Sequence, residues 1–146
     1  MTAKRRDILA RDTYLHLLRV HEALTDEFNA LFKSEGISSP QYNVLRILAG
    51  GPIGGAPCQY IKDRLINRVP DVTRLVDRMQ VAGLTSRHQD ENDRRVVLVK
   101  LTAKGSKLCK RLDLPLMTMH RQQFDGLSRS RLEELHDTLQ AFLDLD

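Results

Sequence analysis

The chain is poor in cysteine, and its apolar residues never gather into a long run. Cys58 and Cys109 are its two cysteines, too few and too widely separated for the disulfide framework of a small secreted domain. No apolar stretch approaches the roughly 20 residues that span a bilayer, and none with a cleavage site follows Met1. We therefore expect a globular protein of the cytoplasm.

The motifs of common catalytic and cofactor sites are also missing. The glycine-rich run from Gly50 to Gly55 lacks the Lys-Ser or Lys-Thr pair and the preceding strand of a phosphate-binding loop, which favours a plain loop. His16 and His21 would lie on different sides of a helix, and no cysteine and histidine spacing fits zinc. No nucleophile stands near a recognisable base motif. The sequence therefore predicts no enzyme, no metal site and no other cofactor.

Length and charge favour one domain that faces an anionic partner. With 146 residues, of which 41% are hydrophobic, the chain can bury a core without a metal or a disulfide. Residues 58–111 carry 13 basic and 6 acidic side chains, whereas residues 112–146 carry 3 basic and 7 acidic ones. Because duplex DNA presents a dense line of phosphates, a basic middle segment is typical of a surface that binds nucleic acid. An ordinary solvated face is the alternative.

Hydrophobic periodicity predicts two helices before the glycine-rich run. Over residues 8–33 apolar side chains recur at three- and four-residue steps, which places them on one stripe of a long helix that Gly36 ends. A second helix is expected over residues 40–49. Ser39 is its expected cap, and Pro40 suits its first turn.

The basic segment begins with the outline of a helix-turn-helix. Short helical patterns over residues 58–65 and 69–82 are joined by a tight turn, with Pro70 expected at the first position of the second helix. The apolar side chains of this second helix share one face. The opposite face, which we expect to enter a major groove, carries Asp71, Thr73, Arg74, Asp77 and Arg78.

A β-hairpin is predicted directly after this helix. Gly83 ends the helix, and the β-prone stretches 84–87 and 96–101 flank a polar connection. A helix-turn-helix followed by such a hairpin is a winged helix, a mainly α fold with a small β wing. Arg94 and Arg95 at the tip of the wing would then reach an adjacent minor groove.

Two further helices are expected at the end of the chain. Thr102 is expected to cap a helix that begins at residue 103, which Pro115 should kink or divide. Ser128 is expected to cap the last helix. The apolar stripes at both ends of the chain are generous for a small winged domain, so we expect a homodimer that buries them.

These residues resemble the MarR group of dimeric winged-helix transcription regulators over nearly the whole chain. The most specific part is similar to the wing signature of that family, an Asp, any residue, an Arg, alternating apolar residues, Leu-Thr and a glycine. Here that signature is Asp93, Arg94, Arg95, Val97, Val99, Leu101, Thr102 and Gly105. Two further segments resemble the family. The recognition helix of the family and its turn into the wing are similar to Val72, Thr73, Arg74, Leu75, Val76, Asp77, Arg78, Met79, Gly83 and Leu84. The helix that precedes its DNA-binding lobe is similar to Ser39, Pro40, Gln41, Tyr42, Val44, Leu45 and Leu48.

The resemblance implies a layout and a function. Residues 1–146 would form one domain, with dimerisation helices over 7–34 and 106–146 and a DNA-binding lobe over 39–105. Two copies would bind a pseudo-palindromic operator of double-stranded DNA, most simply as a repressor. A small aromatic or phenolic ligand is expected between the dimerisation helices and the lobe, near Tyr14, His16 or Tyr42.

The candidate DNA contacts are polar or cationic side chains of the helix-turn-helix and the wing. They are Arg68, Thr73, Arg74, Arg78, Arg94 and Arg95. For the two wing arginines the alternative is an ion pair with Asp90 or Asp93 that stiffens the tip, and Arg94 is the expected minor-groove residue. Weaker phosphate candidates are Lys62, Arg64, Lys104 and Lys107.

Two departures from the family pattern accompany the resemblance. Val69, Pro70 and Asp71 stand where many relatives have a Ser/Thr-rich turn, and the carboxylate of Asp71 would repel phosphate. Family members that sense peroxide use a reactive cysteine in the first long helix, and this chain has none there. Redox sensing would therefore depend on Cys58, for which an unreactive, half-buried thiol is the alternative.

The competing function for the whole protein is a protein-interaction module, in which the winged helix binds an acidic surface of another protein.

Overall fold

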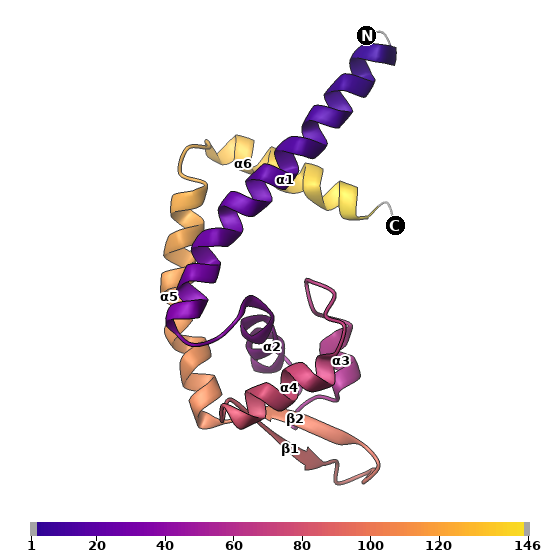
Figure 1. The fold of residues 1–146 in the computed structure, drawn as a ribbon, viewed down its shortest axis with the longest axis vertical. Helices are drawn as coiled ribbons and strands as arrows, with labels where there is room; N and C mark the ends of the chain where they lie inside the picture. The colour runs from indigo at the N-terminus through magenta and orange to yellow at the C-terminus, as the bar shows by residue number, and fades with distance from the viewer. Residues whose placement is uncertain (1–2, 145–146) are drawn as a thin grey trace. The chain divides into compact units, whose positions relative to one another are not determined.

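The computed structural model describes residues 3–144 as helices joined by short loops and one hairpin (Figure 1). The chain divides after Asp113 into two compact units. None of the described helices is both long and apolar enough to cross a membrane. The elements are α1 (Ala3–Ser34), α2 (Ser39–Ala49), α3 (Cys58–Lys62), α4 (Val72–Val81), β1 (Thr85–Gln89), β2 (Val97–Leu101), α5 (Ala103–Gln123) and α6 (Arg129–Leu143).

Helix α2 begins one residue earlier than expected. Its N-cap is Ser38, whose hydroxyl accepts the backbone N–H of Gln41, while the Gln41 side chain accepts the N–H of Ser38 at 2.8 Å. This reciprocal pair is a capping box. The expectation that Ser39 caps the helix is therefore wrong, because its hydroxyl instead donates to the side-chain oxygen of Asn29 at 2.6 Å.

Helix α4 begins later than expected. Its N-cap is Asp71, whose carboxylate accepts the backbone N–H of Arg74 at 2.9 Å. Pro70 lies before the cap and is not the first helical residue. An aspartate satisfies an otherwise unpaired N–H and complements the positive end of the helix, so the cap prevails over the proline signal. Helix α3 is also shorter than expected and ends at Lys62.

The core of the first unit lies where α2, α3, α4, β2 and α5 meet. The largest side chains that are fully buried are Leu45, Ile61, Met79, Leu112, Val44, Val76 and Val99. The turn from α4 into the hairpin uses Gly83, whose φ of 73° lies in the left-handed region that favours glycine. Burial of these apolar side chains is the main force that holds α4 and the hairpin to the rest of the lobe.

The predicted hairpin is confirmed, and its register is defined. β1 and β2 pair antiparallel, from Thr85 opposite Leu101 to Gln89 opposite Val97. Ala56, in the loop before α3, pairs with Val99 on the open edge of β2. The loop thereby ties the wing to the helix-turn-helix, so that α3, α4 and the hairpin form one winged helix (Figure 1).

The two remaining helices begin where the sequence predicts. Thr102 accepts the backbone N–H of Gly105 at 3.0 Å ahead of α5, and Ser128 accepts that of Arg131 ahead of α6. Pro115 does not divide α5, which runs through it to Gln123. No residue of α6 is buried within this chain over its described length, so most of its apolar stripe faces solvent.

Candidate nucleic-acid interface

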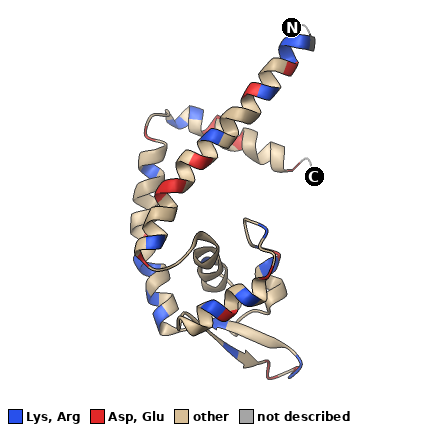
Figure 2. Cartoon of the chain, in the orientation of Figure 1, with Lys and Arg blue, Asp and Glu red and all other residues tan. Residues whose placement is uncertain are grey.

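The outer face of α4 is polar and cationic. Its apolar residues Val72, Leu75, Val76 and Met79 are buried, which leaves the opposite face exposed. Thr73, Arg74 and Arg78 lie on this exposed face. The Arg74 and Arg78 guanidinium groups have no ion-pair partner among residues 3–144. Figure 2 shows that Lys and Arg also mark α3, the hairpin tip and the first half of α5.

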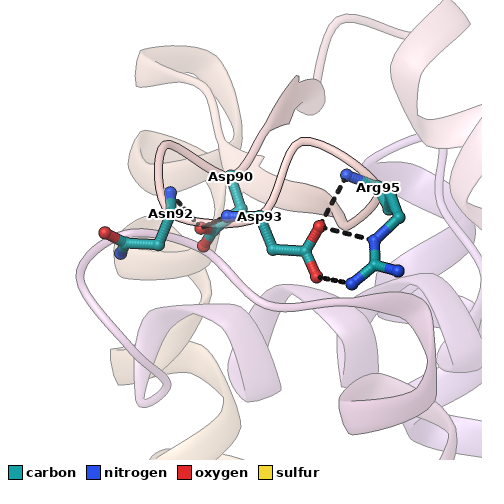
Figure 3. Close-up of polar contacts among 4 residues, drawn as sticks. All are labelled: Asp90, Asn92, Asp93 and Arg95. Carbon is teal, nitrogen blue, oxygen red and sulfur yellow. Dashed lines mark hydrogen bonds and ion pairs between the residues drawn. The ribbon is translucent and has the colours of Figure 1, made fainter.

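The tip of the wing is ordered by two carboxylates (Figure 3). Asp93 accepts the backbone N–H of Arg95 and binds its guanidinium through both carboxylate oxygens at 3.0 Å. Asp90 accepts the backbone N–H groups of Asn92 and Asp93 at 2.7 and 3.0 Å. The hydrogen bonds from Arg95 lower the pKa of Asp93, which favours the charged carboxylate that binds Arg95.

The two arginines of the tip are in different situations. Arg95 is held by Asp93, although its side chain is still 90% exposed. Arg94 is also exposed, and it makes no ion pair within the described part of the chain. The alternative of a stiffening ion pair is thus realised by Arg95, and Arg94 is the guanidinium that is available to a ligand. Arg68, in the loop between α3 and α4, is likewise exposed.

Asp77 is paired with an arginine that lies outside α4. Its carboxylate binds the guanidinium of Arg87, which lies on β1. Arg87 also donates to the backbone carbonyl of Thr73 at 3.3 Å. Sequence reasoning missed Arg87 because the contact joins a helix to a strand across a turn, and no helical spacing rule covers such a pair.

The weaker phosphate candidates divide into held and free side chains. Arg64 lies over the ring of Tyr60, 3.5 Å from its centroid, and donates to the Tyr60 carbonyl. The Lys104 ammonium donates to the carbonyl of Ala82 at 2.8 Å and so caps the end of α4. All four side chains are exposed, and within residues 3–144 Lys62 and Lys107 make no such contact.

The three residues of the expected ligand site do not meet within one chain. The Tyr42 ring stacks on Phe32, with ring centroids 4.7 Å apart, and burial raises the pKa of its hydroxyl. Tyr14 and His16 are exposed in the first half of α1. Since a helix rises about 1.5 Å per residue, Tyr14 lies roughly 27 Å from Phe32 along α1.

The cysteines and histidines form no compact site. Cys109 is buried, and burial raises the pKa of its thiol. Cys58 is half-buried at the start of α3. Over the described residues, no group of three or more His, Cys, Asp or Glu side chains is placed to hold a metal ion.

The lobe as a whole is a winged helix-turn-helix, in which α4 is the second helix and the hairpin is the wing. In DNA-binding proteins of this architecture the second helix lies in the major groove. The fold and the exposed cations therefore define a protein of the DNA-binding winged-helix class.

Comparison with known proteins places the chain within this class. A MarR transcription factor from Planctomyces limnophilus is 35% identical, covers 90% of this chain and 95% of its own, and superposes with a TM-score of 0.69. The homoprotocatechuate degradative operon repressor of Escherichia coli is 26% identical over 88% of this chain and 86% of its own length. No model of a protein family matches the chain. The chain belongs to the MarR family of transcription factors.

The fold is shared with a protein whose structure was solved in complex with DNA. The S. aureus MepR–DNA complex covers 92% of this chain and 97% of its own, with a TM-score of 0.79 and 22% identity. The similarity is one of fold. It shows that the chain has the fold of a protein that was crystallised with DNA.

Proposed function

We propose that the chain is a homodimeric, sequence-specific transcription regulator that binds a pseudo-palindromic operator in double-stranded DNA. Membership of the MarR family supports the regulator. The apolar side chains exposed on α1 and α6 support the dimer. In this arrangement residues 7–34 and 106–144 contribute the dimerisation helices and residues 39–105 the DNA-binding lobe; the last two residues of the expected range 106–146 lie outside the described residues. The proposed location is the cytoplasm, as the sequence led us to expect.

Two recognition helices, one from each copy, enter successive major grooves about 10 base pairs apart. Base and phosphate contacts come from the outer face of α4 and from the loop before it. The Arg94 side chain enters the adjacent minor groove, and Arg95 both fixes the tip and contacts a phosphate. The proposed contacts on each copy are Arg68, Thr73, Arg74, Arg78, Arg94 and Arg95.

The main support for DNA binding is the set of exposed arginines on α4 and the wing. Arg74, Arg78 and Arg94 are exposed cations on α4 and the wing, the two elements that enter DNA grooves in winged-helix proteins. Exposed guanidinium groups without a protein partner keep their full capacity to bind phosphates and guanine edges. Three acidic side chains at the same elements are engaged, because Asp71 caps α4, Asp77 binds Arg87, and Asp93 binds Arg95.

Repression that a small aromatic or phenolic effector relieves is the proposed mode of action. The E. coli relative is named as a repressor of a homoprotocatechuate degradative operon. Tyr14 and His16 are proposed to line the effector site together with Tyr42. Because Tyr42 lies far from the other two within one chain, this site requires that α1 of the second copy approach Tyr42. Effector binding would then shift the dimer between states of different operator affinity.

The proposal is tested by selecting sequences from a random duplex pool with the purified full chain. A palindromic consensus is expected, with half-sites about one helical turn apart. Affinity for the selected duplex should exceed that for random duplex by at least about 1,000-fold. Homoprotocatechuate, added to the complex, is the first effector probe.

The competing function has a clear signature in the same experiment. If the chain shows no preference between the selected pool and random duplex at micromolar protein and moderate salt, specific DNA binding is refuted. The winged helix would then act as a protein-interaction module whose basic face meets an acidic partner.

A further inference from the structure

Arg87 holds the recognition helix at two points. Its guanidinium binds the carboxylate of Asp77 and donates to the carbonyl of Thr73. These two residues are one helical turn apart on α4, and both lie on the exposed face that carries Arg74 and Arg78. A planar, forked guanidinium that binds two points of a helix restrains its rotation about its own axis better than a single contact does.

The strand that carries Arg87 is itself fixed. Arg87 lies opposite Val99 in the hairpin register, and Val99 is fully buried. The backbone of Val99 also exchanges two hydrogen bonds with Ala56, at 2.8 and 3.0 Å. β1 is thus paired with a strand that is anchored to the core, and the Arg87 side chain links it to α4.

Arg87 is poorly placed to bind DNA directly. Its side chain is 26% exposed, compared with 90% for Arg95. Its guanidinium already makes two contacts within the protein. We therefore expect Arg87 to affect DNA binding through its contacts with α4 and not through a contact with a phosphate.

We propose that Arg87 is a positioning residue for DNA recognition: its contacts with Asp77 and Thr73 fix the orientation of α4 relative to the wing, so that base contacts and minor-groove contacts form together. The proposal rests on the proposed function. Breaking the link lets α4 and the wing bind DNA independently. Affinity for the selected sequence falls, whereas affinity for random duplex depends on charge and changes little.

Removing the charge of Asp77 should change DNA affinity in opposite directions under the proposal and under a purely electrostatic account. Removing a negative charge from a surface that binds DNA should raise affinity for every duplex. If the carboxylate serves to hold Arg87, the same change should instead weaken binding to the selected duplex. The variant Asp77→Asn therefore separates positioning from charge.

The experiment compares binding of the full chain to the selected duplex and to random duplex, by fluorescence anisotropy at several salt concentrations. The variants are Asp77→Asn, Arg87→Gln and their combination. The control is Glu91→Gln, which removes one negative charge from the wing at an exposed residue. Thermal unfolding shows that each variant is folded.

The expected result is a fall of about tenfold in the ratio of selected to random affinity for Asp77→Asn. Arg87→Gln should lower the ratio by a similar factor, and the double variant by no more than either single one, since both remove the same link. Glu91→Gln should leave the ratio unchanged while it strengthens both affinities slightly.

The proposal is overturned if Asp77→Asn behaves like Glu91→Gln. If Asp77→Asn does not fold, Arg87→Lys takes its place, because lysine keeps the charge but lacks the fork that makes both contacts. An unchanged affinity ratio for Arg87→Lys then overturns the proposal. A wild-type chain without sequence preference would instead refute the proposed function itself, which distinguishes the two failures.

Discussion

At the scale of single residues, neighbouring side chains of the same type have different roles. Arg94 and Arg95 are adjacent and both exposed, but Asp93 binds Arg95 through two oxygens. Sequence reasoning identified both arginines and the acidic residues beside them. It left open which arginine is paired, because that depends on how the backbone of the tip folds around Asp90.

Replacing Arg94 with alanine tests the role of the free arginine. Arg94→Ala should weaken binding to the selected duplex by about 1–3 kcal/mol and reduce the slope of log affinity against log salt concentration by about one. The loss arises because a cation that contacts phosphates or the minor groove releases counterions on binding. Anisotropy titrations between 50 and 200 mM salt, roughly the range in which such slopes are measured, provide both quantities.

The matched control for this prediction is Lys33→Ala, which removes one cation near the end of α1, outside the helix-turn-helix and the wing. It should change neither the affinity nor the slope by a comparable amount. Affinities of Arg94→Ala that equal those of the wild type across the salt series would show that Arg94 does not contact DNA.

The two thiols should differ in reactivity. Burial raises the pKa of Cys109, which keeps the thiol neutral and weakly nucleophilic near neutral pH. We expect Cys58, which is more exposed, to react with a maleimide at least about tenfold faster than Cys109 at pH 7.5 in the native protein. Mass spectrometry of timed samples measures both rates, and denatured protein should show no such difference. Faster labelling of Cys109 would contradict its burial.

At the scale of elements, the sequence predicted each described helix and the hairpin, and it placed several of their ends wrongly. The start of α2 was marked by Ser38 and Gln41, which have the spacing of a capping box, so a signal for the correct cap was present. For α4, two local signals competed, and the Asp71 cap prevailed over Pro70.

Some contacts between elements could not be predicted from the residues around them in the sequence. The link between Arg87 and Asp77 joins two elements whose mutual approach is set by burial of Met79, Leu84 and Val99 in one core. Such a contact depends on tertiary packing, which periodicity within one element does not report. The same is true of the bridge between Ala56 and Val99. The candidate DNA contacts were easier to find, because exposed cations on an amphipathic helix are visible in the sequence.

Gly105 should be essential for the junction between the wing and α5. A Cβ atom at this position would lie 2.1 Å from the backbone carbonyl oxygen of Leu84, so the two elements would have to move apart. Gly105→Ala should lower the free energy of unfolding by about 3 kcal/mol, the upper part of the range for an overpacked core. Urea denaturation followed by circular dichroism measures the change.

Gly126→Ala is the matched control, since a Cβ there meets nothing within 4 Å. Its free energy of unfolding should stay within about 1 kcal/mol of the wild type. Equal stabilities for the two variants would show that α5 does not approach the Leu84 backbone as closely as the structure has it.

At the scale of the whole molecule, the two ends of the chain present unburied apolar surface. On α1 the stripe divides, because Phe32 near its end is 4% exposed whereas Tyr14 and Leu18 are 60% and 50% exposed. On α6, Leu135 and Leu139 are 37% and 42% exposed. Soluble monomers rarely leave such stripes in water, which is why the periodicity that predicted these helices also predicts a second copy.

Charged substitutions in these stripes should dissociate the proposed dimer and leave the lobe folded. Leu18→Glu on α1 and Leu139→Glu on α6 place a carboxylate within the surface that the second copy would cover, where an unpaired charge is costly. Light scattering should show a dimer for the wild type and a monomer for the combined variant. Ile53→Glu, in a loop at a fully exposed side chain, is the control and should remain dimeric. Because a monomer reads only one half-site, affinity for the selected duplex should fall by at least about 100-fold; a combined variant that stays dimeric would place the interface elsewhere.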